Sequence, residues 1–162
     1  MKYMFASDVH GSAYYCRKTL DAYKEEKAER LVLLGDLLYH GPRNDLPKEY
    51  APKEVIAMLN EMKKEIYAVR GNCEAEVDQM VLQFPVMADY CILNLDGRTF
   101  YATHGHVYNE NNLPPIQEGD ILIHGHTHVL RAERKEGYVI LNPGSVSIPK
   151  EGNPPTYAIF ED

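Results

Sequence analysis

Aspartate, asparagine and histidine residues recur directly after short apolar runs of this chain. Carboxylate, amide and imidazole groups suit Mn²⁺, Fe²⁺, Ni²⁺ or Zn²⁺ in sites that keep room for water. Two such ions, held about 3.5–4 Å apart, catalyse hydrolysis of phosphate esters. The sequence therefore predicts a two-metal hydrolytic site, with Asp36 as the bridging carboxylate. The segments that carry the seven candidate ligands are Asp8-Val9-His10, Gly35-Asp36, Gly71-Asn72, His104 and Gly125-His126-Thr127-His128.

The spacing within two of these segments favours convergence of their side chains. Asp8 and His10 are two residues apart, as are His126 and His128. Alternate residues of an extended backbone point to the same side. An isolated histidine is more often structural than a ligand, but two such pairs beside other ligand types make the structural alternative weak.

The elements that must position these residues alternate between strands and helices in the first half of the chain. We expect strands at 3–6, 31–34 and 66–69, one helix capped by Ser12 and ending near Lys27, and another opened by Pro52. Such units form a parallel sheet with right-handed crossovers. Ligands gather at the carboxyl ends of its strands, where Asp8, Asp36 and Asn72 fall.

The second half of the chain is richer in strands. Residues 90–95 and 98–103 flank Asp96-Gly97, the strongest hairpin signal in the sequence. Further strands are expected at 121–123, 131–134, 138–141 and 157–160. The predicted fold is a single α/β domain over residues 1–162. In it, a parallel first sheet packs face to face on a more antiparallel second sheet, with helices outside.

Composition limits the partners of this protein. A chain of 162 residues with 44% hydrophobic residues can bury one core. Its net charge of −7 argues against an extended nucleic-acid-binding surface. The three cysteines follow no zinc-finger spacing and indicate reduced thiols in a cytoplasmic protein. No apolar stretch approaches the roughly 20 residues of a membrane span, and the sequence leaves a monomer and a homo-oligomer both open.

In their order and spacing, the five ligand segments resemble the signature of the calcineurin-like metallophosphoesterases. Four longer blocks resemble the small YfcE-type bacterial phosphodiesterases: residues 40–44 (HGPRN), 70–73 (RGNC), 76–80 (EVDQM) and 142–150 (NPGSVSIPK). The resemblance extends from Met4 to about Tyr157. It implies a four-layer αββα sandwich, in which two mixed sheets are flanked by helices.

The resemblance also implies how the ligands divide between two divalent ions. By the family pattern, Asp36 bridges two sets: Asp8, His10 and His128 for one ion, and Asn72, His104 and His126 for the other. Mn²⁺ is the preferred ion, with Ni²⁺, Fe²⁺, Zn²⁺ and Co²⁺ as alternatives. A metal-bridging hydroxide would attack the phosphorus of a small phosphodiester in line.

Four further residues are candidates for contact with the substrate. Many members of the family have a histidine where this chain has Cys73, and that histidine is thought to protonate the leaving group. A thiol with a pKa near 8.5 suits this role less well, which favours substrates with good leaving groups. His106 is a candidate replacement, with loop packing as its alternative. Arg43 is a candidate to grip phosphate oxygens rather than a solvated surface residue, and His40 is placed in the same pocket.

Three functions compete for this site. A divalent-metal-dependent phosphodiesterase is the favoured hypothesis. A phosphomonoesterase, including a phosphoprotein phosphatase, would use the same metals on a different substrate. A non-catalytic protein-binding scaffold, like the eukaryotic retromer subunit that resembles this fold, is disfavoured because all seven ligand positions keep competent residue types.

Overall fold

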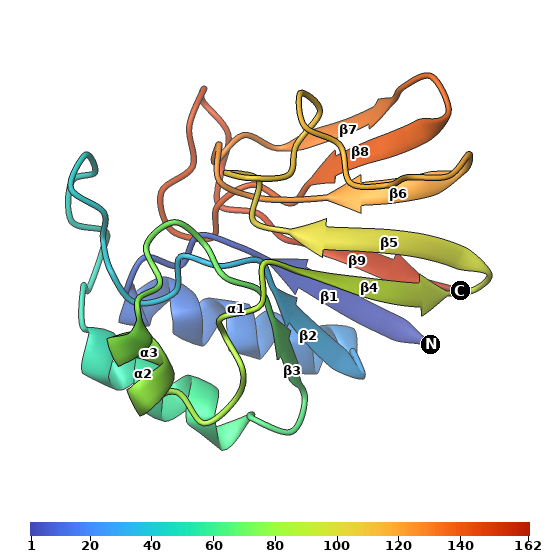
Figure 1. Ribbon diagram of the computed structural model, residues 1–162. Coiled ribbons are helices and arrows are strands. Elements are labelled where there is room, and N and C mark those ends of the chain that lie inside the picture. Colours follow the sequence, from blue (N-terminus) through green and yellow to red (C-terminus); the bar gives the residue numbers. More distant parts are fainter.

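The structure is a computed structural model that describes all residues from Met1 to Asp162. The chain has three helices and nine strands. The strands form two sheets that lie against each other (Figure 1). The elements in chain order are β1 (Lys2–Ala6), α1 (Ala13–Glu26), β2 (Arg30–Leu33), α2 (Pro52–Glu61), β3 (Ile66–Ala68), α3 (Glu76–Val81), β4 (Tyr90–Leu95), β5 (Arg98–Thr103), β6 (Asp120–Ile123), β7 (Arg131–Arg134), β8 (Tyr138–Asn142) and β9 (Ala158–Glu161).

The first sheet has the strand order β3-β2-β1-β9. Strands β1, β2 and β3 are parallel, as the alternating strand and helix pattern predicted. The last strand, β9, pairs antiparallel with β1 through residue pairs such as Tyr3 and Phe160. The first sheet is therefore mixed: its parallel part, β1 to β3, is as expected, and β9 adds an antiparallel edge. A strand that arrives from the far end of the chain need not follow the crossover rule of the β1–β3 units.

The second sheet has the strand order β4-β5-β6-β8-β7. The hairpin β4–β5 and the pair β7–β8 are antiparallel, whereas β5, β6 and β8 run parallel. The Asp96-Gly97 turn of the predicted hairpin has positive φ at both residues, 50° and 70°, which matches the right-handed twist of the strands it joins. Two mixed sheets flanked by helices are thus confirmed.

Alternation along the strands of the first sheet separates two apolar layers. Met4 and Leu31 face the helices, while Phe5 and Val32 face the second sheet. Between the sheets, Phe5 stacks on Phe100 with ring centroids 5.8 Å apart. Burial of large side chains on both faces of the first sheet holds the two sheets in one fixed relation.

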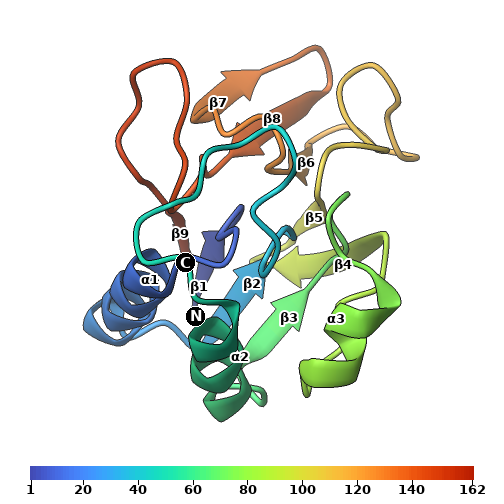
Figure 2. The same cartoon turned by 90° about the vertical axis from the view of Figure 1, so that its left-hand side faces the viewer.

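The helices precede the second sheet in the chain, and none follows Val81. Helix α1 begins after Ser12, whose Oγ accepts a hydrogen bond from Tyr15 N at 3.1 Å, so the predicted N-cap is confirmed. Helix α2 begins at Pro52, as predicted. The helical part of the αββα arrangement is therefore concentrated beside the first sheet (Figure 2). No helix is long and apolar enough to cross a membrane.

Candidate metal centre

The ligand-bearing turns lie at the carboxyl ends of parallel strands. Asp8, Asp36 and Asn72 follow β1, β2 and β3, while His104 follows β5 and the segment 126–128 follows β6. Because the strands within each parallel set point the same way, their ends collect at one side of the two sheets (Figure 1). The predicted convergence of segments far apart in sequence is what the structure shows.

Most of these turns have a left-handed backbone. The residues with positive φ are Asp8 (58°), His10 (50°), Asp36 (55°), His126 (71°) and His128 (60°). Non-glycine residues in this region cost on the order of 1–3 kcal/mol each. The backbone at these turns is therefore not extended as expected, although Asp8 and His10 still meet in one cluster. His126 and His128 in fact point to different ligand clusters.

Backbone hydrogen bonds between neighbouring turns hold this strained geometry. Asp8 N–H donates to Gly35 O at 3.1 Å, and His10 N–H donates to Asp36 O at 2.9 Å. Gly125 N–H donates to His104 O at 2.8 Å in the second sheet. Each ligand turn is thereby attached to the next one, which over-determines its conformation.

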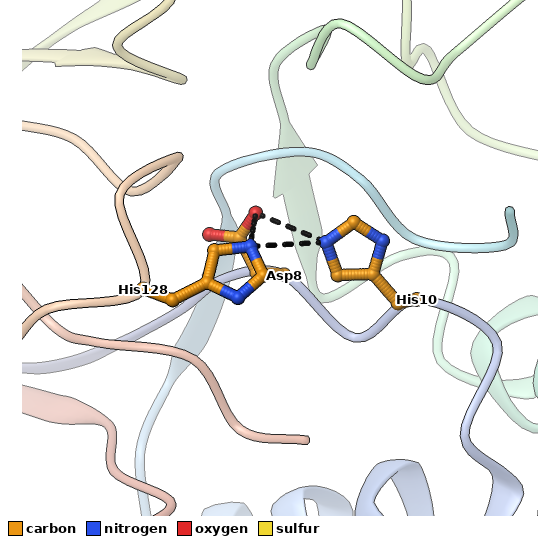
Figure 3. Close-up of side chains that lie close together, drawn as sticks. All are labelled: Asp8, His10 and His128. Atoms are coloured by element: carbon orange, nitrogen blue, oxygen red, sulfur yellow. Dashed lines mark hydrogen bonds and ion pairs between the residues drawn. The ribbon is translucent and has the colours of Figure 1, made fainter. Parts of the chain in front are cut away.

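The first cluster consists of Asp8, His10 and His128 (Figure 3). Asp8 Oδ1 lies 3.4 Å from His10 Nε2 and 3.3 Å from His128 Nε2. The two Nε2 atoms are themselves only 3.2 Å apart. All three side chains are buried.

The tautomers of these two rings are set by carbonyl groups on their far sides. His10 Nδ1 lies 2.8 Å from Tyr39 O, and His128 Nδ1 lies 2.7 Å from Ile148 O. A carbonyl accepts only, so each Nδ1 must donate, and each Nε2 then directs a lone pair into the cluster. Two lone pairs facing each other at 3.2 Å need a cation between them.

The second cluster consists of Asp36, His104 and His126 with the amide of Asn72. His104 Nδ1 donates to Leu34 O at 2.6 Å, which directs its Nε2 toward Asp36 Oδ2 at 3.2 Å. His126 is turned the other way and presents Nδ1, which lies 3.2 Å from His104 Nε2. Asn72 Oδ1 lies 3.0 Å from both of these nitrogens. With its Nδ1 donating to Leu34 O, His104 directs an Nε2 lone pair at two oxygen acceptors, Asp36 Oδ2 and Asn72 Oδ1, and a cation there would satisfy all three groups.

One carboxylate oxygen supports the fit of a metal most directly. Asp8 Oδ2 accepts hydrogen bonds from Ser7 Oγ at 2.7 Å and from His126 N at 3.0 Å. Asp8 Oδ1 is buried and has no hydrogen-bond partner, although His10, His128 and His104 nitrogens surround it within 3.9 Å. A buried acceptor without a partner is costly in a protein interior. A divalent ion would satisfy it.

Charge interactions within the cluster change the pKa values of its members. Burial disfavours the charged form of Asp8, but the rings of His10 and His128, which lie within 3.4 Å of its Oδ1, hold its pKa well below the usual range when they carry a proton on Nε2. Burial likewise opposes protonation of His104, but the hydrogen bond to Asp36 and the charge of Asp8 raise its pKa to about 9. A site that binds protons this strongly has the negative charge needed to bind a divalent ion.

A small cavity of about 110 Å³ opens directly onto the ligands. Arg43 and Lys150 line it, both exposed, and neither forms an ion pair. Two unpaired cations beside a pocket of this size fit a phosphate group. Its lining consists of His10, Asp36, Gly41, Pro42, Arg43, Asn44, Asn72, Cys73, His126, His128 and Lys150.

The other histidines divide between the centre and its support. His106 is exposed, and its ring lies 5.3 Å from the His104 ring, measured between centroids. His40 does not line the cavity; its Nδ1 donates to Gly41 O at 2.6 Å and its ring packs on Tyr39 and Tyr50. The structure thus brings His106 to the edge of the centre and uses His40 to shape the loop that carries Arg43.

Two residues at this site were not singled out from the sequence. Glu74 is buried, and its carboxylate accepts from Asp36 N at 2.7 Å and from Gly71 N at 3.3 Å. It therefore joins the turns after β2 and β3. Lys150 ends the 142–150 block, within which Ser145 and Ser147 donate to Asp8 O. In the sequence, Glu74 could have been found as an acidic residue directly after the 70–73 block. Lys150 could have been found as the charged last residue of the 142–150 block, which was interpreted as structural.

Comparisons with known proteins give one consistent result. A model of the calcineurin-like phosphoesterase superfamily domain matches residues 1–161. Phosphodiesterase YfcE of Escherichia coli (strain K12) is 47% identical over 162 residues, which cover 100% of this chain and 88% of that protein. A solved structure of this phosphoesterase from E. coli superposes with a TM-score of 0.98 at 47% identity, covering 100% of this chain and 89% of that one.

A more distant structure shares the fold alone. Vps29 of Entamoeba histolytica, solved in complex with Zn²⁺, superposes with a TM-score of 0.64 at 21% identity. The match covers 100% of this chain and 86% of that one. At this level of identity the likeness says nothing about activity.

Proposed function

This chain belongs to the calcineurin-like phosphoesterase superfamily, and on that basis we propose that it hydrolyses small phosphodiesters with two divalent metal ions, Mn²⁺ first among them. One observation carries the proposal. His10 Nε2 and His128 Nε2 face each other at 3.2 Å beside the unpartnered Asp8 Oδ1, while the Nδ1 of each ring donates to a backbone carbonyl, and a divalent cation satisfies this arrangement.

We assign the two ions to the two clusters, with Asp36 shared. When bound, two such ions activate water as a nucleophile and neutralise charge on phosphoryl oxygens. The chain positions the remaining parts. The carbonyls of Tyr39, Ile148 and Leu34 orient the ligand rings, and burial of Asp8 and His104 excludes competing water.

The substrate side of the site supports a phosphate ester whose leaving group departs easily. Arg43 and Lys150 line the cavity and can hold phosphate oxygens. Burial, together with the charges of Asp36 and Glu74, raises the pKa of the Cys73 thiol to about 12, so it is a poor proton donor at neutral pH. Burial and the charge of His104 lower the pKa of His106, so its ring is neutral at pH 7. Neither group is a strong acid for the leaving oxygen.

The other two functions are less well supported. A phosphomonoesterase would use the same metals, but the relative of 47% identity is a phosphodiesterase. A protein-binding scaffold would not require a buried carboxylate oxygen without a partner among three imidazoles. We therefore keep the monoesterase as the second candidate, to be separated by substrate.

Turnover by the metal-depleted chain tests the proposal. Metal-free protein should hydrolyse neither an aryl phosphodiester nor the matching aryl monoester, and Mn²⁺ should restore turnover, with the diester faster. Asp36→Asn should remain inactive with Mn²⁺ because the shared carboxylate loses its charge. A faster monoester reaction would favour the second candidate. Two bound Mn²⁺ ions without any turnover would contradict both.

A further inference from the structure

Cys73 lies inside the ligand cluster. A nitrogen of His10, a carboxylate oxygen of Asp36 and Cys73 Sγ all lie within 4.8 Å of one another. The backbone fixes this position, because Cys73 N–H donates to Asp36 Oδ1 at 2.9 Å. The sulfur also lines the small cavity, where an ion from solvent can reach it.

This third ligand set differs from the other two in its chemistry. The clusters around Asp8 and around His104 offer carboxylate, amide and imidazole groups, which suit Mn²⁺. The set of His10, Asp36 and Cys73 adds a thiol, and thiolate selects thiophilic ions such as Zn²⁺ and Cd²⁺ over Mn²⁺. The same pocket therefore offers different coordination to two classes of ion.

The two kinds of coordination compete for the same atoms. His10 has one ring nitrogen for a metal, because its Nδ1 donates to Tyr39 O. An ion bound to His10 Nε2 and Cys73 Sγ takes that nitrogen away from the cluster with Asp8 and His128. It also draws on Asp36, which both ions of the proposed centre share.

We propose that Cys73 makes this centre an inhibitory site for thiophilic divalent ions, which bind to His10, Asp36 and Cys73 Sγ in place of the Mn²⁺ arrangement. The inference rests on the proposed metal centre, and it does not depend on the substrate. On binding, the S–H bond of Cys73 breaks, an S–metal bond forms and the proton leaves to solvent. No atom changes its oxidation state.

Absorbance spectroscopy tests the sulfur–metal bond without any turnover. Cd²⁺ and, separately, Co²⁺ are titrated into the metal-free full chain while thiolate-to-metal charge-transfer absorption is followed in the ultraviolet. The wild type should develop this band and Cys73→Ser should not. Cys91→Ser is the matched control, since Cys91 is also half-buried but lies in β4, and it should keep the band. No band in the wild type, or a band of full intensity in Cys73→Ser, overturns the proposal. If Cys73→Ser does not fold, Cys73→Ala takes its place.

Inhibition tests the consequence. Mn²⁺-loaded wild type and Cys73→Ser are titrated with Zn²⁺, each normalised to its own activity with Mn²⁺. The variant should require a Zn²⁺ concentration at least on the order of 10-fold higher for half-inhibition, because it loses one ligand of the inhibitory ion. Equal sensitivity overturns the proposal. A charge-transfer band without diester turnover would contradict the proposed function but support this inference. Diester turnover without a band would support the proposed function and overturn this inference.

Discussion

The position of a single proton on each imidazole decides what this centre can bind. Carbonyl acceptors hold Nδ1–H of His10, His128 and His104, so three Nε2 lone pairs converge on buried carboxylates. His126 is turned the other way, so that its Nδ1 faces Asn72 Oδ1 and His104 Nε2. In the absence of metal, protons must supply the missing positive charge, which explains the raised pKa of about 9 at His104.

Metal binding should therefore release a proton and strengthen as the pH rises. At pH 7 the metal-free His104 is protonated, because its pKa is about 9, and Mn²⁺ must displace that proton. We expect the affinity for Mn²⁺ to rise by roughly tenfold per pH unit for each proton displaced, up to about pH 9. Calorimetric titration in two buffers of different ionisation enthalpy measures the released proton. An affinity that does not vary between pH 7 and 9 would refute this prediction.

Arg43 should contribute to substrate binding and not to metal binding. Loss of a charge-assisted hydrogen bond costs about 1.5–3 kcal/mol, so Arg43→Ala should raise KM by about 10-fold or more with both ions retained. Arg134→Ala is the matched control, because Arg134 is an exposed residue of β7 outside the cavity lining. Steady-state kinetics with metal analysis measure both quantities. A KM equal to that of the control would show that Arg43 is a solvated surface residue without contact to the substrate.

At the scale of elements, the ligand turns are packed against one another with no spare room. A Cβ built on Gly125 would overlap Ser7 Oγ and lie 2.6 Å from Asp8 Oδ2. One on Gly71 would overlap Asp36 Oδ1. Glycine at these positions allows a turn from one strand to lie directly on the ligand of another.

Gly125→Ala should abolish high-affinity metal binding, because the added methyl group displaces the Asp8 carboxylate. Gly97→Ala is the control: the hairpin turn it changes has φ of 70° but open space around its Cβ. The control should lose roughly 1 kcal/mol of stability and bind Mn²⁺ normally. Mn²⁺ titration and thermal unfolding of both variants separate the two effects. Equal metal affinity in the two variants would mean that the turn after β6 can relax.

Glu74 should act on the metals through the turns that it joins. Glu74→Ala leaves the N–H groups of Asp36 and Gly71 without their acceptor, and we expect Mn²⁺ affinity to fall by about 10- to 100-fold. Glu74→Gln keeps an amide oxygen for these donors and should retain most of the affinity. Calorimetric titration of both variants makes the comparison. Wild-type affinity in Glu74→Ala would show that the turns hold without it.

At the scale of the whole molecule, the metal centre lies across the junction of two sheets. Asp8, Asp36 and Asn72 come from the first sheet, and His104, His126 and His128 from the second. The apolar contact of Phe5 with Phe100 joins the same two sheets beneath the centre. Ions bound there would link the two sheets.

Removal of the ions should lower thermal stability. A ligand present at 100 times its Kd stabilises the folded state by about 2.7 kcal/mol, which corresponds to roughly 5–10 °C in Tm for a domain of this size. Calorimetric unfolding with Mn²⁺ and with a chelator measures the shift. Asp36→Asn is the control and should show a much smaller one. A Tm that does not depend on metal in the wild type would contradict a centre that links the sheets.

The sequence by itself predicted most of the element types and a list of candidate ligands, but not helix α3 (Glu76–Val81). Periodicity, the Ser12 cap, Pro52 and the Asp96-Gly97 turn are local signals, and the structure has each of them as predicted. The strand-end positions of Asp8, Asp36 and Asn72 predicted their convergence, because the ends of parallel strands meet at one edge.

Only the tertiary structure decided how those ligands meet. The separation of His126 from His128, the antiparallel β9 and the part played by Glu74 depend on left-handed turns and on contacts between residues far apart in the chain. The same holds for the carbonyls that orient each ring and for the unpartnered Asp8 Oδ1. A local pattern can name a ligand, but its donor atom and its direction are set by the groups that pack around it.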